Sequence, residues 1–186
     1  VLDLMERQAL RHSAANPSRA DAVRLSDLAW QEIERQRYGG AMSAARMAIA
    51  SDPRWGDGYR MLGLAYLRTG RIEKARQTYA EGLQAIPGDA HLIASIADLE
   101  WDRKEYPAAE AAFRLALAAQ PPHSEPHKLL LALGLAIYEQ GRLAEAASFL
   151  QRARDAGPMD PQPLLALGRV YLKEGRIQDA IRMGRE

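Results

Sequence analysis

The sequence has no cysteine and few aromatic residues, which make up 6% of its 186 residues. Without cysteine there can be no disulfide framework, no thiol nucleophile and no zinc site with thiolate ligands. No apolar run approaches the roughly 18 residues that a membrane-spanning helix needs, so direct membrane insertion is not expected. The scarcity of aromatics, with abundant alanine and leucine, favours packed helices over sheets.

The sequence also lacks an excess of charge of either sign. Its 25 basic and 24 acidic residues are interspersed and give a net charge of +1. Proteins that bind nucleic acid or a membrane surface normally carry a patch of one sign, so neither partner is expected. Abundant alanine and arginine with few lysines indicate a bacterial gene of high GC content. We expect a soluble protein of the bacterial cytoplasm or periplasm, and composition does not choose between these compartments.

Catalytic motifs are missing as well. The chain has no glycine-rich phosphate loop followed by Lys-Ser/Thr and no GxSxG elbow. Asp98 and Asp102 lie one helical turn apart, but their neighbours do not suggest desolvation, so we interpret them as solvated charges rather than an acid/base pair. His123, Glu125 and His127 resemble a metal site, but a proline between them interrupts the helix that would align both imidazoles. The sequence predicts no enzyme activity, no metal and no cofactor.

What the chain does contain is an internal repeat. Three kinds of position recur at the same interval: a small residue that opens a helix, an aliphatic–small pair before it, and a closing proline. The spacings between the five small residues are 34, 34, 37 and 34 residues. In chain order the three sets are Ala41, Ala75, Ala109, Ala146 and Ala180; Leu28-Ala29, Leu62-Gly63, Ile96-Ala97, Leu133-Gly134 and Leu167-Gly168; and Pro53, Pro87, Pro121 and Pro158. A fixed period of this length predicts a repeat architecture.

The clearest copy runs from Gly56 to Asp89. It predicts two short helices joined by a tight turn and closed by a proline, because apolar residues recur every three or four positions and give each helix one buried stripe. Gly70 supplies the turn conformation that other residues resist. A single helix pair cannot bury its own stripe, so neighbouring pairs must stack.

This pattern resembles the tetratricopeptide repeat over about residues 22–186. The turn strings TGRIEKA, QGRLAEA and EGRIQDA carry the resemblance, together with the columns given above. It implies an all-α fold: one continuous right-handed α-solenoid of stacked antiparallel helix pairs. The expected segments are a partial preceding helix at 1–21, a degenerate first repeat at 22–55, repeats at 56–89 and 90–123, an insertion at 124–126 within the connector 121–126, a repeat at 127–160 and a truncated fifth repeat at 161–186.

The degenerate first copy and the connector lead to further predictions. Glu32 stands where a tyrosine is usual, and Gly39-Gly40 is expected to form the inner turn. The three prolines make the 121–126 connector stiff and extended. We expect the flexing between repeats to be centred at this connector. Neither end of the array supplies a convincing polar cap. We therefore expect the native chain to continue on at least one side, or the end faces to pack against another copy.

The resemblance also implies a binding groove. In such arrays the first helices of successive repeats line a concave surface through their second, fifth, ninth, twelfth and thirteenth places. The candidate groove residues are Trp30, Arg60, Leu64, Arg68, Asp98, Trp101, Asp102, Lys128, Leu131, Leu135, Tyr138, Glu139, Arg169 and Lys173. Large aromatics of this kind dominate interface hot spots. Alternatively, the leucines and aromatics of this set pack against the next helix.

Family members that bind chaperones clamp a carboxylate with Lys and Asn at set groove positions. Here no ninth place holds asparagine, so a cochaperone of that type is not expected. Three functional hypotheses remain. The first is a non-catalytic scaffold whose groove binds a protein or peptide partner to help assemble a larger complex. The second is a module of a bacterial polysaccharide synthesis or export system. The third is the substrate-docking arm of a larger transferase.

Overall fold

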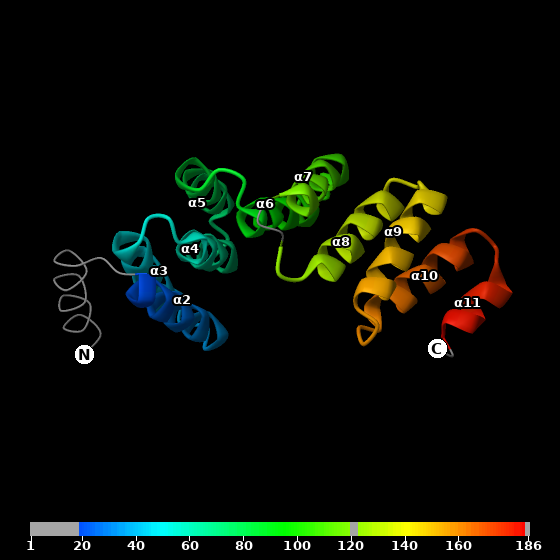
Figure 1. Cartoon of the computed structure of the whole chain (residues 1–186), viewed down its shortest axis with the longest axis horizontal. Helices are drawn as coiled ribbons and strands as arrows, with labels where there is room; N and C mark the ends of the chain where they lie inside the picture. The colour runs from blue at the N-terminus through cyan, green and yellow to red at the C-terminus, as the bar shows by residue number, and fades with distance from the viewer. Residues whose placement is uncertain (1–18, 120–122, 185–186) are drawn as a thin grey trace. The chain divides into compact units, whose positions relative to one another are not determined.

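The computed structural model describes residues 19–119 and 123–184, and within these ranges every regular element is an α-helix. The all-α repeat fold is therefore confirmed, whereas most of the helix expected over residues 1–21 lies outside the described residues. The helices are α2 (Arg19–Glu34), α3 (Tyr38–Ser51), α4 (Gly56–Arg68), α5 (Ile72–Ala85), α6 (Ala90–Asp102), α7 (Tyr106–Ala118), α8 (Pro126–Glu139), α9 (Leu143–Ala156), α10 (Gln162–Lys173) and α11 (Ile177–Met183) (Figure 1).

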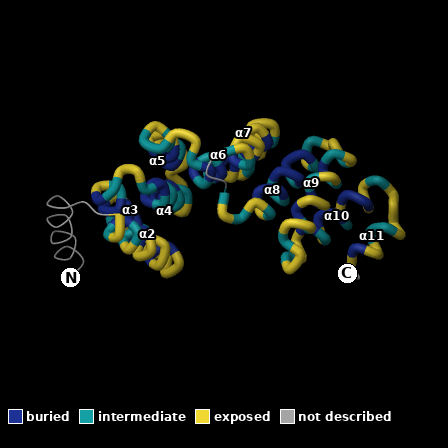
Figure 2. The backbone as a smooth tube through the Cα atoms, viewed as in Figure 1, coloured by how far each residue is buried: buried dark blue, intermediate teal, exposed yellow. Residues whose placement is uncertain are grey.

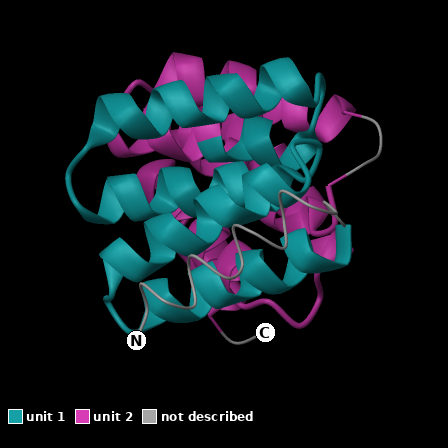
Figure 3. Cartoon of the chain, turned by 90° about the vertical axis from the view of Figure 1, so that its left-hand side faces the viewer, with its two compact units in different colours: residues 1–95 teal, residues 96–186 magenta. Residues whose placement is uncertain are grey.

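The chain divides into two compact units, residues 1–95 and 96–186 (Figure 3). In the first unit α2 packs on α3, α3 on α4 and α4 on α5, and α2 also contacts α4. In the second unit the pairs are α7 with α8, α8 with α9, α9 with α10 and α10 with α11, and α8 also contacts α10. The boundary between the units falls inside α6, within the third predicted repeat. The repeat boundaries themselves remain predictions.

One turn geometry closes each of the five helix pairs that the described residues form. At each turn a backbone N–H donates to the carbonyl oxygen five residues earlier, and the residue before the donor has a positive φ. The five bonds are Arg37 to Glu32 (2.8 Å), Arg71 to Tyr66 (2.9 Å), Glu105 to Glu100 (2.9 Å), Arg142 to Ile137 (3.3 Å) and Arg176 to Tyr171 (2.8 Å). This is the Schellman closure, which satisfies carbonyls left over at a helix C-terminus.

Glycine provides the positive φ in three turns but not in the other two. Gln36 (59°) and Lys104 (62°) take the same left-handed conformation in the first and third turns. The prediction that Gly39-Gly40 forms the first turn is therefore wrong, because α3 begins at Tyr38 and both glycines lie in its first helical turn. A Cβ on Gly40 would approach Glu32 Oε2 to 2.7 Å, so this glycine leaves room for the buried Glu32 carboxylate.

Small residues let the paired helices approach closely. A Cβ on Gly63 of α4 would lie 2.1 Å from Cε1 of Tyr79 on α5. A Cβ on Gly134 of α8 would lie 2.8 Å from Leu150 of α9. Figure 2 shows buried and exposed residues alternating along the helices of each unit, as expected for helices that bury one stripe.

Candidate functional site

The four groove candidates of the first unit lie at its surface. Trp30 on α2 is 46% exposed, and Arg68 at the end of α4 is exposed. Arg60 and Leu64 on α4 are half-buried, and Arg60 forms an ion pair with Asp57 one turn earlier. Because α2 contacts α4, these side chains belong to two packed first helices of one unit.

The three candidates on α6 differ in character. Asp98 and Asp102 are exposed. Trp101 is half-buried, and its ring meets the Tyr106 ring edge to face, with centroids 5.2 Å apart and an interplanar angle of 62°. An aromatic pair of this geometry stabilises the turn between α6 and α7. Trp101 therefore has a packing role that the sequence offered as an alternative.

The remaining seven candidates lie on α8, at its C-terminal end and on α10, two first helices that are in contact. Residues three and four positions apart share one side of a helix, which places Lys128, Leu131, Leu135 and Tyr138 in a row along α8. We call this row, with its counterpart on α10, the α8–α10 face. The members of that counterpart are Gln162, Leu165, Arg169, Leu172 and Lys173.

The α8–α10 face carries apolar side chains from both helices. Leu131, Leu135 and Tyr138 are half-buried. Leu165 and Leu172 on α10 are 60% and 59% exposed. Exposed apolar side chains grouped on one face indicate an interaction surface more strongly than scattered ones do.

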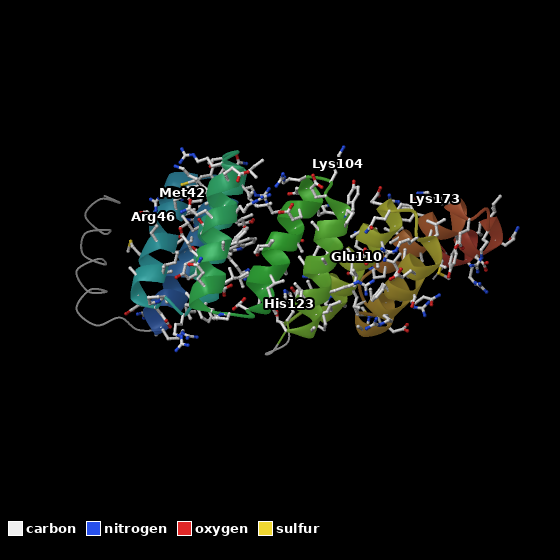
Figure 4. The ribbon with its side chains drawn as sticks, turned by 90° about the horizontal axis from the view of Figure 1, so that it is seen from above. Met42, Arg46, Lys104, Glu110, His123 and Lys173 are labelled. Carbon is white, nitrogen blue, oxygen red and sulfur yellow. The ribbon has the colours of Figure 1, made fainter. Side chains whose placement is uncertain are left out.

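Two cations stack on one aromatic ring at the C-terminal end of this face. The Arg169 guanidinium lies 5.1 Å and the Lys173 ammonium 4.5 Å from the centroid of the Tyr138 ring. Arg169 also pairs with Glu139 at 3.7 Å. Among the described residues no carboxylate lies within ion-pair distance of Lys173, which extends from the last turn of α10 (Figure 4). The ring therefore holds two positive charges against a single carboxylate.

A cleft of about 810 Å³ opens at the other end of the face. It lies between the start of α8, the start of α10 and the loop that precedes α10. Its lining residues are His127, Lys128, Leu131, Gly157, Pro158, Met159, Asp160 and Gln162. Met159 at the tip of the loop is 94% exposed, and Lys128 pairs with Glu125 at 2.6 Å.

Sequence reasoning found part of this cleft. It predicted Lys128 and Leu131 as site residues, whereas His127 and the loop residues of the cleft were missed. The available signal was Met159, an apolar residue in the loop string GPMDP, where such a side chain cannot be buried in a helix interface.

A second polar cluster of the second unit was also missed. Glu110 on α7 is 8% exposed and accepts hydrogen bonds from Arg142 (2.8 and 2.9 Å), Gln140 (2.8 Å) and Arg114 (2.9 and 3.0 Å). The bonds from the Arg142 guanidinium, helped by those from Gln140 and Arg114, lower the pKa of Glu110 from 4.5 to about 2 against the opposing effect of burial. All these donors converge on one carboxylate, so this cluster, whose Glu110 is labelled in Figure 4, ties helices together and is not a ligand site.

The Glu110 cluster lies next to a departure from the repeat pattern. In α4 and α10 the tyrosine of the first helix accepts a hydrogen bond from the preceding second helix: Arg46 to Tyr66 (2.9 Å) and Gln151 to Tyr171 (3.3 Å). Ile137 occupies the tyrosine place in α8 and has no hydroxyl to accept such a bond. The Glu110 cluster provides the polar link between neighbouring helix pairs at that position.

The described residues show neither a metal site nor a membrane span. They contain no group of three or more His, Asp or Glu side chains that could hold a metal ion. In the same residues no helix is both long and apolar enough to cross a membrane.

Helix pairs that share one closing turn and stack through small residues define an α-helical repeat protein. The family model described as Tetratricopeptide repeat matches residues 26–90 and 95–161. The matched segments make up most of the chain, and the chain therefore belongs to the tetratricopeptide repeat family.

Among curated proteins, the chain is similar to the TPR repeat-containing protein PA4667 of Pseudomonas aeruginosa, with 30% identity over 115 residues. The match covers 61% of this chain and 19% of that relative, so the chain spans about one fifth of the relative's length.

Two solved structures show the same fold. The structure of Pseudomonas aeruginosa PilF has a TM-score of 0.80 at 17% identity, covering 88% of this chain and 73% of PilF. YrrB, described as a TPR protein with an unusual peptide-binding site, has a TM-score of 0.63 at 16% identity, covering 88% of this chain and 82% of YrrB. At these identities the likeness concerns the fold alone.

Proposed function

We propose that the protein is a non-catalytic scaffold that binds a peptide segment of a protein partner on the α8–α10 face and so helps to assemble a larger complex. The observation that carries this proposal is the combination, on one face, of an open 810 Å³ cleft, exposed leucines and a stacked cation pair. An apolar groove with a few placed polar groups is the usual form of a peptide site. The solved structure of YrrB, which shares the fold, is described as peptide-binding.

The composition of the α8–α10 face favours a flexible peptide as its binding partner over the rigid surface of a folded protein. Leucine and tyrosine side chains lie along α8 and α10, and Met159 lies in the loop that precedes α10. A short segment can place an apolar side chain in the cleft while its backbone remains solvated over the open part of the face. Methionine at the rim adapts its shape to different apolar side chains.

The test is selection from a random twelve-residue peptide library displayed on phage, carried out on the purified chain. We expect peptides that bind the wild type to lose most of their binding to Leu165→Asp. A charge in the middle of an apolar contact surface should weaken binding by at least tenfold. Leu115→Asp is the matched control, because Leu115 on α7 is also an exposed leucine (63%) but lies outside the α8–α10 face.

The outcomes separate the hypotheses. Equal loss with both variants, or no loss with either, would rule out this face as the peptide site, provided that circular dichroism shows both variants folded. Selection of no peptide, together with binding of an acidic polysaccharide, would favour the polysaccharide hypothesis. Self-association through the end faces and the compartment remain predictions.

A further inference from the structure

The two ends of the α8–α10 face differ in chemistry, and the difference specifies a ligand. We infer that the face recognises a partner segment carrying one apolar side chain, which enters the cleft, and one side-chain carboxylate, which binds Arg169 and Lys173. This inference rests on the proposed peptide-binding function and adds to it the chemistry and spacing of the peptide.

The C-terminal end of the face attracts an anion. Arg169 and Lys173 both lie over the Tyr138 ring. The ring holds their charged groups in place and replaces some of the water molecules around them. Glu139 balances one of these charges through its 3.7 Å contact with Arg169. An incoming carboxylate could bind the Lys173 ammonium with one oxygen and accept a hydrogen bond from the Arg169 guanidinium with the other.

The cleft end is less favourable for an anion than the end at Tyr138, although His127 also lines it. Asp160 lines the cleft, and the one lysine there, Lys128, is already paired with Glu125 at 2.6 Å. Leu131 and Met159 give the same cleft its apolar contact surface. The apolar side chain of the peptide therefore belongs at the cleft and the carboxylate at Tyr138, and the opposite orientation is disfavoured.

Helix geometry sets the distance between the two groups. Leu131 and Tyr138 are seven residues apart and Lys128 and Tyr138 ten residues apart on α8, which corresponds to about 10–15 Å along the helix. An extended peptide covers about 3.3 Å per residue. The carboxylate should therefore follow or precede the apolar residue by roughly three to five positions.

This carboxylate differs from the chain terminus that carboxylate-clamp repeats bind. Both cations come from a single helix and are held by the tyrosine of the preceding first helix. The library peptides can be displayed as N-terminal fusions to a coat protein, so that they have no free C-terminus. Any preference for acidic peptides must then come from the side-chain carboxylates of Asp and Glu.

The experiment repeats the display selection with wild type, Lys173→Met and Lys74→Met and sequences the bound pools. We expect Asp or Glu to be enriched three to five positions from an apolar residue in the wild-type pool and the enrichment to disappear with Lys173→Met. Lys74 is the matched control, because it also lies over a tyrosine, Tyr66 at 5.9 Å, but in the first unit. The peptides that bind Lys74→Met should remain enriched in Asp or Glu.

A second measurement uses one selected peptide, labelled with fluorescein and titrated by polarisation. Replacing its acidic residue by the amide should weaken binding about five- to tenfold, the usual range for a charge-assisted contact. Glu139→Gln should strengthen binding of the acidic peptide about two- to fivefold, because it removes the carboxylate that competes for Arg169. Binding to wild type should weaken as salt is raised.

Failure of the inference is distinct from failure of the proposed function. Bound peptides that are sensitive to Leu165→Asp but show no acidic enrichment, or whose affinity falls with Glu139→Gln, would overturn the inference and leave the peptide site in place. An absence of any peptide sensitive to Leu165→Asp would overturn both.

Discussion

Two residues without glycine's freedom, Gln36 and Lys104, hold the left-handed conformation that closes a helix pair. This conformation brings Cβ too close to the following carbonyl and costs about 1–2 kcal/mol in a residue other than glycine. Each residue also donates the second hydrogen bond of the Schellman closure, from its own N–H to the carbonyl three residues earlier: Gln36 to Ile33 (2.8 Å) and Lys104 to Trp101 (2.8 Å). The helices on either side impose the turn conformation. In each of the two turns the backbone strain is confined to one residue.

The strain at these two turns should be relieved by glycine. We expect Gln36→Gly and Lys104→Gly each to raise the free energy of unfolding by about 0.5–1 kcal/mol, the relief of strain exceeding the extra entropy of the unfolded chain. Chemical denaturation at pH 7 measures this change. Gly70→Ala is the reciprocal control and should destabilise the protein by about 1 kcal/mol, because φ at Gly70 is +72°. Destabilisation by both glycine variants would contradict the strain argument.

At the scale of the element, the distance between paired helices depends on single small residues. The α4–α5 pair is close because Gly63 has no Cβ to meet the Tyr79 ring, which is itself 2% exposed. The ring cannot move aside without opening the core that surrounds it. Helix propensity plays no part here, since glycine weakens a helix interior.

Two glycine-to-alanine changes separate packing from propensity. Gly63→Ala should destabilise the protein by about 2–3 kcal/mol, because its Cβ would lie 2.1 Å from Tyr79 Cε1. Gly39→Ala should stabilise it by about 0.5–1 kcal/mol, because nothing lies within 4 Å of the added Cβ and alanine favours the helix. Thermal denaturation of the two variants and the wild type tests whether the first change lowers and the second raises the stability. Equal effects would mean that close packing does not set the α4–α5 distance.

At the scale of the whole molecule, both units link helix pairs through a tyrosine hydroxyl, and the second unit adds a link of another kind. In the first unit Arg46 donates to the hydroxyl of Tyr66. In the second unit the Glu110 cluster links α7 to the end of α8 and the start of α9, across 32 residues of sequence. The predicted hinge at 121–126 belongs to the connection between α7 and α8, and residues 120–122 lie outside the described residues. The Glu110 cluster should restrain any motion at that hinge, because it joins the helices on both sides of it.

The Glu110 cluster makes the stability of the protein depend on pH. Because the pKa of Glu110 falls from 4.5 to about 2 on folding, its contribution is complete above about pH 5 and is lost as pH falls from 4.5 towards 2. We expect Glu110→Gln to lower the free energy of unfolding by on the order of 2–3 kcal/mol at pH 7 and by much less at pH 3. Urea denaturation across this range measures the difference.

Two further measurements define this prediction. Glu145→Gln removes a carboxylate that pairs with the same arginines but has a side chain 41% exposed, and it should change stability by less than about 1 kcal/mol. Hydrogen exchange at the α8–α9 turn should be faster in Glu110→Gln than in wild type. A pH-independent difference between Glu110→Gln and wild type would show that packing, and not the charge of Glu110, holds this link.

The sequence alone determined the elements of this protein. Apolar spacing of three and four, small residues at a fixed period and turn glycines are local features, because a helix forms and ends through contacts within a few residues. The helical repeat fold could therefore be predicted from the strings that carry the period. The first turn was misplaced because Gly39-Gly40 is the obvious turn signal, whereas stacking imposed the turn on Gln36.

Only the tertiary structure decided which side chains meet at the surface. The stacking of Arg169 and Lys173 on Tyr138, the cleft completed by Met159 and the convergence of donors on Glu110 join residues about 30 or more positions apart. The period predicts which residues are equivalent but not what they contact. Those contacts depend on how the side chains of one helix pair fill the space left by its neighbour, and that space exists only once the pairs have stacked.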